Sequence, residues 1–286
     1  MSDRIGDQPT MLDIAEALAP GWERWRARIE ENVAPVREWM LRGLAPRPGD
    51  ILLELAAGAG DTGFEAVTRA GEDGQLISTD FSPAMVEVAR RRAAELGLAN
   101  VDHRVMDAES IELDADSVDG VLCRFGYMLM AEPAAALAET RRVLRPGGRV
   151  ALAVWSAPER NPWIAIGFGL LVDRGLIPPP EPGAPSPFAM ASEEHTRALL
   201  GGAGFDDVRT EEVPVRFPFR DLDDYMTYAS DTGGPAALVL RDMPDGERDA
   251  LKAQLGAAFE SFRADGGYVL PGLALTAVAT SGATTV

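Results

Sequence analysis

Apolar residues in the middle of the chain gather in short runs that are separated by longer segments of mixed polarity. We predict a buried β-strand at each run, over residues 51–55, 75–79, 101–106, 118–123 and 149–155. Amphipathic helices are predicted between several of these strands, over residues 62–70, 82–97 and 133–144. Strands that alternate with helices in this way favour right-handed crossovers and a parallel sheet with helices on both faces.

The regions on either side are predicted to be mainly helical. Residues 10–45 have the pattern of amphipathic helix, and residues 221–264 that of two or three helices. Further elements are predicted as helices at 163–174 and 192–201 and strands at 208–217 and 268–279. The fold class is therefore α/β, a doubly wound, mostly parallel seven-stranded sheet with N-terminal helices and a helical lid inserted in the C-terminal half.

We expect one domain over residues 1–286, built from three regions. These are an N-terminal helical cap at 1–45, a central core at 46–156, and lid helices with the last strands of the sheet at 157–286.

The composition narrows the classes of function. The formal net charge is −18 and the pI is near 4.5, which argues against a nucleic-acid or anionic-membrane surface because both need clustered positive charge. Cys123 is the single cysteine, so an intrachain disulfide and a multi-cysteine metal site are excluded, and no metal is expected. The longest apolar stretch, 163–172, is half the ~20 residues that span a bilayer. With an acidic N-terminus that lacks an apolar signal region, the chain is expected to be cytoplasmic.

The predicted strand at 51–55 runs directly into a glycine-rich turn, Gly58-Ala-Gly60-Asp-Thr-Gly63. Glycines let the backbone turn sharply, and the helix that follows directs its free N–H groups towards a bound ligand. The spacing matches the dinucleotide fingerprint, and Asp80 follows 20 residues beyond Gly60. S-adenosylmethionine offers the same ribose diol to such an acid, so the turn and Asp80 leave both cofactors open.

Three features favour S-adenosylmethionine over NAD(P). Glu54 lies four residues before Gly58, where its carboxylate would repel a pyrophosphate but would suit a cationic sulfonium and ammonium. The single lysine, Lys252, is not part of the Tyr-x-x-x-Lys pair that short-chain oxidoreductases need. Asp107 ends the third strand and places a second carboxylate at the same edge of the sheet.

Five motifs in order resemble the cofactor domain of class I S-adenosylmethionine-dependent methyltransferases (methyltransferase type 11), and most closely the ubiquinone/menaquinone biosynthesis C-methyltransferases. The motifs are LLELAAGAGDTG (52–63), STDFSPAMVEVARRRA (78–93), DAESIEL (107–113), VDGVLCRFGYMLM (118–130) and ALAETRRVLRPGGRVALAVWS (136–156). The resemblance implies the Rossmann-like methyltransferase fold and makes residues 46–156 the cofactor-binding core. The segment after the fourth strand and the C-terminal lid do not match the quinone enzymes well.

The resemblance also implies which residues bind each part of the cofactor. Those around the methionine part are Glu54, Ala56, Gly58 and Gly60, with Arg124 near the transferring methyl group. Those at the ribose and adenine are Asp80, Phe81, Met85, Asp107 and Ala108. Asp80 would accept both ribose hydroxyls, and Asp107 would accept the adenine amino group.

Methyl transfer is an in-line displacement at an already activated carbon, so the enzyme has mainly to position the acceptor and exclude water. The acceptor pocket is expected outside the carboxyl ends of the fourth and fifth strands. The residues expected there are Phe125, Tyr127, Met128, Trp155 and Trp163, with Trp22 and Tyr225 as further contributions. Such a lining suits a small aromatic or lipophilic acceptor.

No catalytic residue is assigned from the sequence. His195, Asp231 and Tyr225 are candidate bases that nothing in the chain ranks. Two alternatives to a methyltransferase stay open at this point, a NAD(P)-dependent oxidoreductase of Rossmann type and a non-catalytic binding protein of the same fold. The acceptor atom and the oligomeric state are not predicted.

Overall fold

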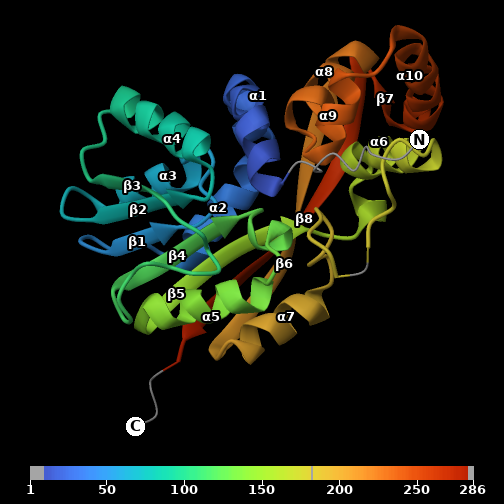
Figure 1. Ribbon diagram of the computed structural model, residues 1–286. Helices are drawn as coiled ribbons and strands as arrows, with labels where there is room; N and C mark the ends of the chain where they lie inside the picture. The colour runs from blue at the N-terminus through green and yellow to red at the C-terminus, as the bar shows by residue number, and fades with distance from the viewer. Residues whose placement is uncertain (1–9, 182, 283–286) are drawn as a thin grey trace, which may run out of the picture.

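The computed structural model describes residues 10–181 and 183–282, and its centre is a twisted sheet (Figure 1). The strands of these residues are β1 Ile51–Glu54, β2 Gln75–Asp80, β3 Val101–Val105, β4 Val118–Arg124, β5 Leu144–Trp155, β6 Phe205–Phe219, β7 Arg263–Ala264 and β8 Gly267–Ser281. Their order is β3-β2-β1-β4-β5-β8-β6, with β7 paired to β8 off this path. Strands β1 to β5 are parallel, and β8 is antiparallel to both of its long neighbours. The predicted doubly wound, mostly parallel sheet is confirmed, with seven strands on its main path and the two-residue β7 at its side.

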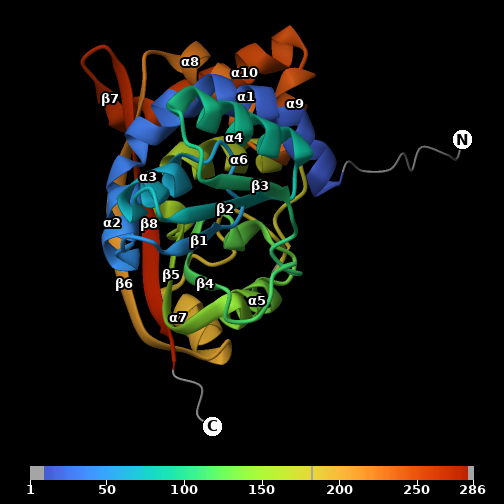
Figure 2. The same ribbon diagram turned by 90° about the vertical axis from the view of Figure 1, so that its left-hand side faces the viewer.

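Helices cover both faces of this sheet (Figures 1 and 2). Those of the described residues are α1 Met11–Asn32, α2 Ala34–Leu44, α3 Asp61–Ala70, α4 Pro83–Leu96, α5 Pro133–Val143, α6 Pro162–Asp173, α7 Glu193–Gly202, α8 Leu222–Thr232, α9 Pro235–Arg241 and α10 Asp245–Phe259. Helices α2 and α3 pack against each other and on the central strands, whereas α5 and α7 pack together on β5 and β6. No helix in this part of the chain is long and apolar enough to cross a bilayer.

Among the boundaries that differ from the sequence prediction, two have a clear local cause. The stretch at 10–45 is two helices, because the chain leaves helical geometry at Val33, just before Pro35 enters the first turn of α2. The fifth strand begins at Leu144, so the predicted start at residue 149 was wrong. Leu144 pairs with Val118 before the register shifts at a bulge, so a Pro-Gly-Gly turn lies within the strand.

The lid rests on a two-stranded extension of the sheet. β5 pairs with residues 274–280 of β8, whereas residues 268–273 of β8 pair with the second half of β6. Helices α8, α9 and α10 lie between β6 and β8 in sequence, as predicted for the inserted lid, and surround this extension at the upper right of Figure 1.

Helix α1 lies between the central core, residues 46–156, and this lid. It packs against α4 on one side and α8 on the other, which Figures 1 and 2 show from two directions. Gly21 permits the close approach to α8, because a Cβ there would overlap the backbone carbonyl of Asp231. At the other contact, the Glu16 carboxylate accepts hydrogen bonds from Ser82 and Ala84 at the start of α4. α1 is thus fixed to both halves of the molecule.

Candidate functional site

The glycine-rich turn connects β1, which ends at Glu54, to α3, which begins at Asp61. Gly58 and Gly60 have positive φ angles of 55° and 82°, and Ala56 also lies in the left-handed region at 49°. A Cβ on Gly60 would overlap the Phe64 ring, so this position requires glycine. The turn therefore packs closely onto the start of α3.

The Glu54 carboxyl is buried beneath the turn and is only 2% exposed. Its Oε1 atom accepts the Gly63 N–H at 2.9 Å, whereas Oε2 has no hydrogen-bond partner in the described residues. A Cβ on Gly63 would overlap that second oxygen, which explains the third glycine of the turn. Burial raises the pKa of Glu54 to about 8, although Arg124 and the Gly63 N–H favour the charged form.

Three further buried polar atoms around the turn also lack a partner in the described part of the chain. They are Asp61 Oδ2, Thr62 Oγ1 and Arg124 Nη1. Buried polar groups in folded proteins are normally paired, so such atoms at one place indicate a site for a polar ligand. Glu54 and Asp61 would suit a cation, and Arg124 a carboxylate. An amino acid carries one group of each charge, so the residues present fit the methionine part of S-adenosylmethionine.

Asp80 lies at the end of β2, next to the same turn, and is 6% exposed. Its Oδ2 accepts the Gly58 N–H at 2.9 Å, and its Oδ1 accepts the Ser82 N–H at 3.0 Å. Burial raises the pKa of Asp80, and these two N–H groups oppose that shift. Asp80 therefore holds the glycine turn against the start of α4.

The residues expected at the adenine lie on both sides of Asp80. Phe81 follows it with 40% of its surface exposed, and Met85 is buried on α4. Asp107 and Ala108 follow the neighbouring strand β3. Asp107 is exposed and accepts the Glu109 N–H at 2.9 Å, whereas Ala108 is buried. The accessible Phe81 ring and the exposed Asp107 leave groups that could contact a purine at this sheet edge.

Arg124 ends β4 and forms an ion pair with Glu30 of α1. One turn earlier on the same helix, Arg26 Nη1 lies 2.7 Å from Asp61 Oδ1. The sequence analysis missed Arg26 and Glu30, because an amphipathic helix far from the glycine turn gives no local signal of such contacts. Their spacing of four residues, which puts them on one helix face, was the signal available.

Aromatic side chains gather beside Arg124, where the acceptor was expected. Phe125 stacks on Trp155 with ring centroids 4.1 Å apart, and Trp163 lies edge-on to Trp155 at 5.1 Å. Phe217 of β6, which the sequence analysis did not include, stacks on Trp163 at 3.7 Å. Phe125 has a φ of 62°, rare for a bulky residue, and such strain is found at binding sites.

Two other expected acceptor residues lie behind this cluster. Tyr127 is fully buried, and its hydroxyl is 2.6 Å from the Thr140 hydroxyl. The sulfur of Met128 accepts the Trp155 N–H at 3.5 Å. Both contacts hold the chain that follows β4, so Tyr127 and Met128 support the aromatic cluster in this structure.

The remaining candidates from the sequence lie in the cap and the lid, or away from both. Trp22 is 38% exposed on α1. Tyr225 is buried on α8, donates its hydroxyl to the Trp163 carbonyl at 3.3 Å, and has a raised pKa because of burial. Asp231 accepts hydrogen bonds from Arg24 and Trp25. His195 is exposed on α7, which packs on α5 and β6.

Metal and thiol chemistry find no support in the described residues. No group of three or more His, Cys, Asp or Glu side chains in residues 10–181 and 183–282 could hold a metal ion. Cys123 is buried in β4, and burial raises the pKa of its thiol to about 12. It is therefore a core residue.

Comparison with known proteins relates part of this chain to a protein family. The profile of a methyltransferase domain family matches residues 52–148. The demethylmenaquinone methyltransferase of Clavibacter sepedonicus is 39% identical over 129 residues, which are 45% of this chain and 50% of that protein. The chain spans about half the length of the curated relatives it matches.

Two solved structures share the fold over most of the chain. The YcgJ protein of Bacillus subtilis has a TM-score of 0.59 and 19% identity, over 87% of this chain and 98% of its own. The phosphoethanolamine N-methyltransferase 2 of Haemonchus contortus, solved with S-adenosyl-L-methionine, has a TM-score of 0.59 and 16% identity, over 97% of this chain and 61% of its own. Residues 52–148 are therefore a class I methyltransferase domain whose cofactor is S-adenosylmethionine, and the domain resembles that of the ubiquinone/menaquinone C-methyltransferases.

Proposed function

We propose that the protein transfers the methyl group of S-adenosylmethionine to a small aromatic or lipophilic acceptor by in-line displacement. The observation that carries this proposal is the set of unpaired buried polar atoms around the glycine turn, together with Asp80 at the neighbouring strand end. The unpaired atoms have the charges that an amino acid requires, and Asp80 lies where a ribose is expected. The family of residues 52–148 supports the same cofactor.

The acceptor is proposed to bind against the cluster of Phe125, Trp155, Trp163 and Phe217. Aromatic rings that stack and meet edge to face favour a flat, apolar ring as their ligand. The Clavibacter sepedonicus relative is named as a methyltransferase of demethylmenaquinone, a quinone, and this supports a ring-shaped acceptor here. Phe125 follows Arg124 directly, so an acceptor on this cluster would lie beside the methionine end of the cofactor.

The chain's task in this reaction is mainly positioning. The acceptor atom has to lie at about 3–3.5 Å from the methyl carbon and in line with the sulfur–carbon bond, in a place from which water is excluded. The lid helices and α1 would provide that exclusion. A base is needed only for an acceptor that loses a proton, and none is proposed. We also propose that the protein is cytoplasmic and that its partner is a small-molecule acceptor.

Isothermal titration calorimetry with S-adenosylhomocysteine tests the cofactor, with NADH as the competing ligand. Asp80→Ala is expected to weaken S-adenosylhomocysteine at least tenfold, about 1.4 kcal/mol, because the ribose loses a charged acceptor and the turn loses its anchor. Asp102→Ala is the matched control, since Asp102 lies on β3 and its salt bridge to Arg104 is partly exposed. Unchanged affinity in Asp80→Ala would remove Asp80 from the site. NADH binding without S-adenosylhomocysteine binding would overturn the proposed function.

A further inference from the structure

Helix α1 contributes two charged side chains to the methionine end of the candidate site. Arg26 pairs with Asp61 at the start of α3, and Glu30 pairs with Arg124 at the end of β4. All four side chains are at most 25% exposed, so water weakens these pairs less than it weakens surface pairs. Because Arg26 and Glu30 are four residues apart, they lie on one face of the helix.

The two partners of α1 share a second property. Asp61 Oδ1 accepts from Arg26, whereas its Oδ2 is buried without a partner. Arg124 donates from Nη2 to Glu30, whereas its Nη1 is buried without a partner. Each side chain is therefore held by α1 at one end and is left unpaired at the other, within the residues that the structure describes. The unpaired atoms lie among those around Glu54 that fit an amino acid.

Glu30 is itself held in place from a second direction. Its Oε2 lies 2.6 Å from Arg37 Nη1, and the Nε atom of Arg37 lies 2.7 Å from a Glu65 oxygen on α3. The chain of pairs thus runs from the end of β4 through α1 and α2 to the helix that follows the glycine turn. A side chain fixed by two arginines has little freedom, so it can orient Arg124.

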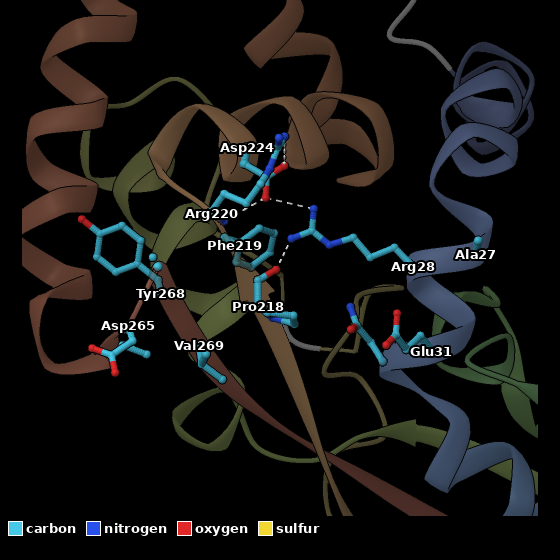
Figure 3. A pocket seen from close by; sticks show the side chains of 14 residues that line it. Ala27, Arg28, Glu31, Pro218, Phe219, Arg220, Asp224, Asp265, Tyr268 and Val269 are labelled. Carbon is cyan, nitrogen blue, oxygen red and sulfur yellow. Dashed lines mark hydrogen bonds and ion pairs between the residues drawn. The ribbon is translucent and has the colours of Figure 1, made fainter.

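Arg28 of α1 contacts the lid and not the glycine turn. Arg28 reaches away from the turn to Asp224 and to the carbonyl of Pro218, at one side of a groove of about 480 Å³ (Figure 3). Its guanidinium also lies over the rings of Trp25 and Phe219. These contacts attach α1 to the lid and involve none of the unpaired atoms around the turn.

We propose that Arg26 and Glu30 are positioning residues that aim Asp61 and Arg124 at the amino-acid part of the cofactor. The inference rests on the proposed function. In this arrangement Arg124 binds the cofactor carboxylate through its second nitrogen, and Asp61 with Glu54 binds the ammonium group. Neither Arg26 nor Glu30 would touch a reacting atom. Their effect is restricted to the methionine end, because the ribose acid, Asp80, is bonded to Gly58 and Ser82 and to neither of them.

The test compares two ligands that differ only in this part. S-adenosylhomocysteine carries the amino acid, whereas 5′-methylthioadenosine has the same adenosine and sulfur without it. Calorimetry is performed with the wild type, Arg26→Ala, Glu30→Ala and Glu30→Gln. Glu23→Ala is the matched control, because Glu23 is on the same helix and pairs with Arg91 of α4.

Arg26→Ala and Glu30→Ala are expected to weaken S-adenosylhomocysteine roughly tenfold while 5′-methylthioadenosine changes less than about twofold. Glu30→Gln is expected to lose less than Glu30→Ala, because an amide oxygen can still accept from Arg124. A thermal melt of each variant confirms folding, and Glu23→Ala is expected to bind both ligands as the wild type does.

Two results would overturn the inference alone. One is wild-type affinity for S-adenosylhomocysteine in both alanine variants, and the other is an equal loss for the two ligands, which would indicate a general structural effect of α1. If the wild type binds neither ligand, the proposed function fails and the inference fails with it. The three outcomes are distinguishable in one set of titrations.

Discussion

At the scale of single residues, Glu54 is notable because its carboxyl group, which is normally charged, is buried. Its pKa lies near 8 instead of 4.5, and Arg124, Asp61 and Glu30 are the charged groups that act on it besides burial. In the protein without cofactor, Glu54 is therefore mostly protonated at neutral pH. Because its pKa is raised in the folded state, the stability it contributes is fully present below about pH 4.5 and is lost as pH rises through 8.

Cofactor affinity is expected to depend on pH through this group. The ammonium of S-adenosylhomocysteine favours ionised Glu54, so binding releases a proton wherever the empty site is protonated. Affinity should rise between pH 6 and 8 by up to about tenfold per unit and level off above 8. Calorimetry in buffers of different ionisation enthalpy measures the proton release directly.

Glu54→Gln is the control for that pH dependence. Glutamine can still accept the Gly63 N–H, so the turn should keep its geometry while the titrating group is removed. Affinity in this variant is expected to be weak and flat over the same pH range. A wild-type affinity that does not change between pH 6 and 8 would contradict the role given to Glu54.

The site could be predicted in part from these residues. Glu54 and Asp80 end strands that short apolar runs predict, and Gly58 and Gly60 follow the first of these strands. Local sequence therefore places all four residues at one edge of the sheet. The pairs of Arg26 and Glu30 with Asp61 and Arg124 join residues 35 and 94 positions apart. No local pattern encodes which charges meet over such distances, because the approach of α1 depends on packing of the whole chain.

At the scale of elements, α1 and α8 approach closely through Gly21. Gly21→Ala is expected to separate the two helices and to destabilise the protein by about 1–3 kcal/mol, since the new methyl group would overlap the Asp231 carbonyl. Urea denaturation measures the change in the free energy of unfolding.

Gly169→Ala in α6 provides the comparison. A Cβ at Gly169 would meet no atom within 4 Å, so only the helix propensity changes, and this favours alanine by about 1 kcal/mol. Equal effects of the two substitutions would show that the close contact of α1 with α8 does not matter for stability.

The element boundaries show where sequence patterns lose information. β5 runs through Arg145-Pro146-Gly147-Gly148, a sequence typical of a turn, because Leu144 pairs with Val118 before a bulge and pairing with β4 resumes beyond it. The strands β6 and β8 reach further than their apolar alternation predicts, since Phe205 pairs with Ser281 at one end and Phe219 pairs with Tyr268 at the other. Tertiary pairing, which no short window contains, determined these ends.

At the scale of the whole molecule, α1, β6 and β8 link the cofactor core to the lid. We therefore expect one cooperative thermal transition, as predicted for a single domain over residues 1–286. Saturating S-adenosylhomocysteine at about 100 times its Kd should add about 2.7 kcal/mol and raise the Tm by several degrees. Differential scanning calorimetry checks both results, and two separate transitions would indicate that core and lid unfold independently.

The position of α1 has a consequence for the redesign of this protein. One face of the helix forms salt bridges with Asp61 and Arg124. Another face forms salt bridges with Asp224 and Asp231 of the lid. A chimaera that receives residues 157–282 from another methyltransferase would keep the α1 of this chain, whose side chains pair with the lid that was replaced. Exchange of acceptor specificity between such proteins should therefore succeed when residues 11–32 are transplanted together with the C-terminal half, and fail when that half is moved alone.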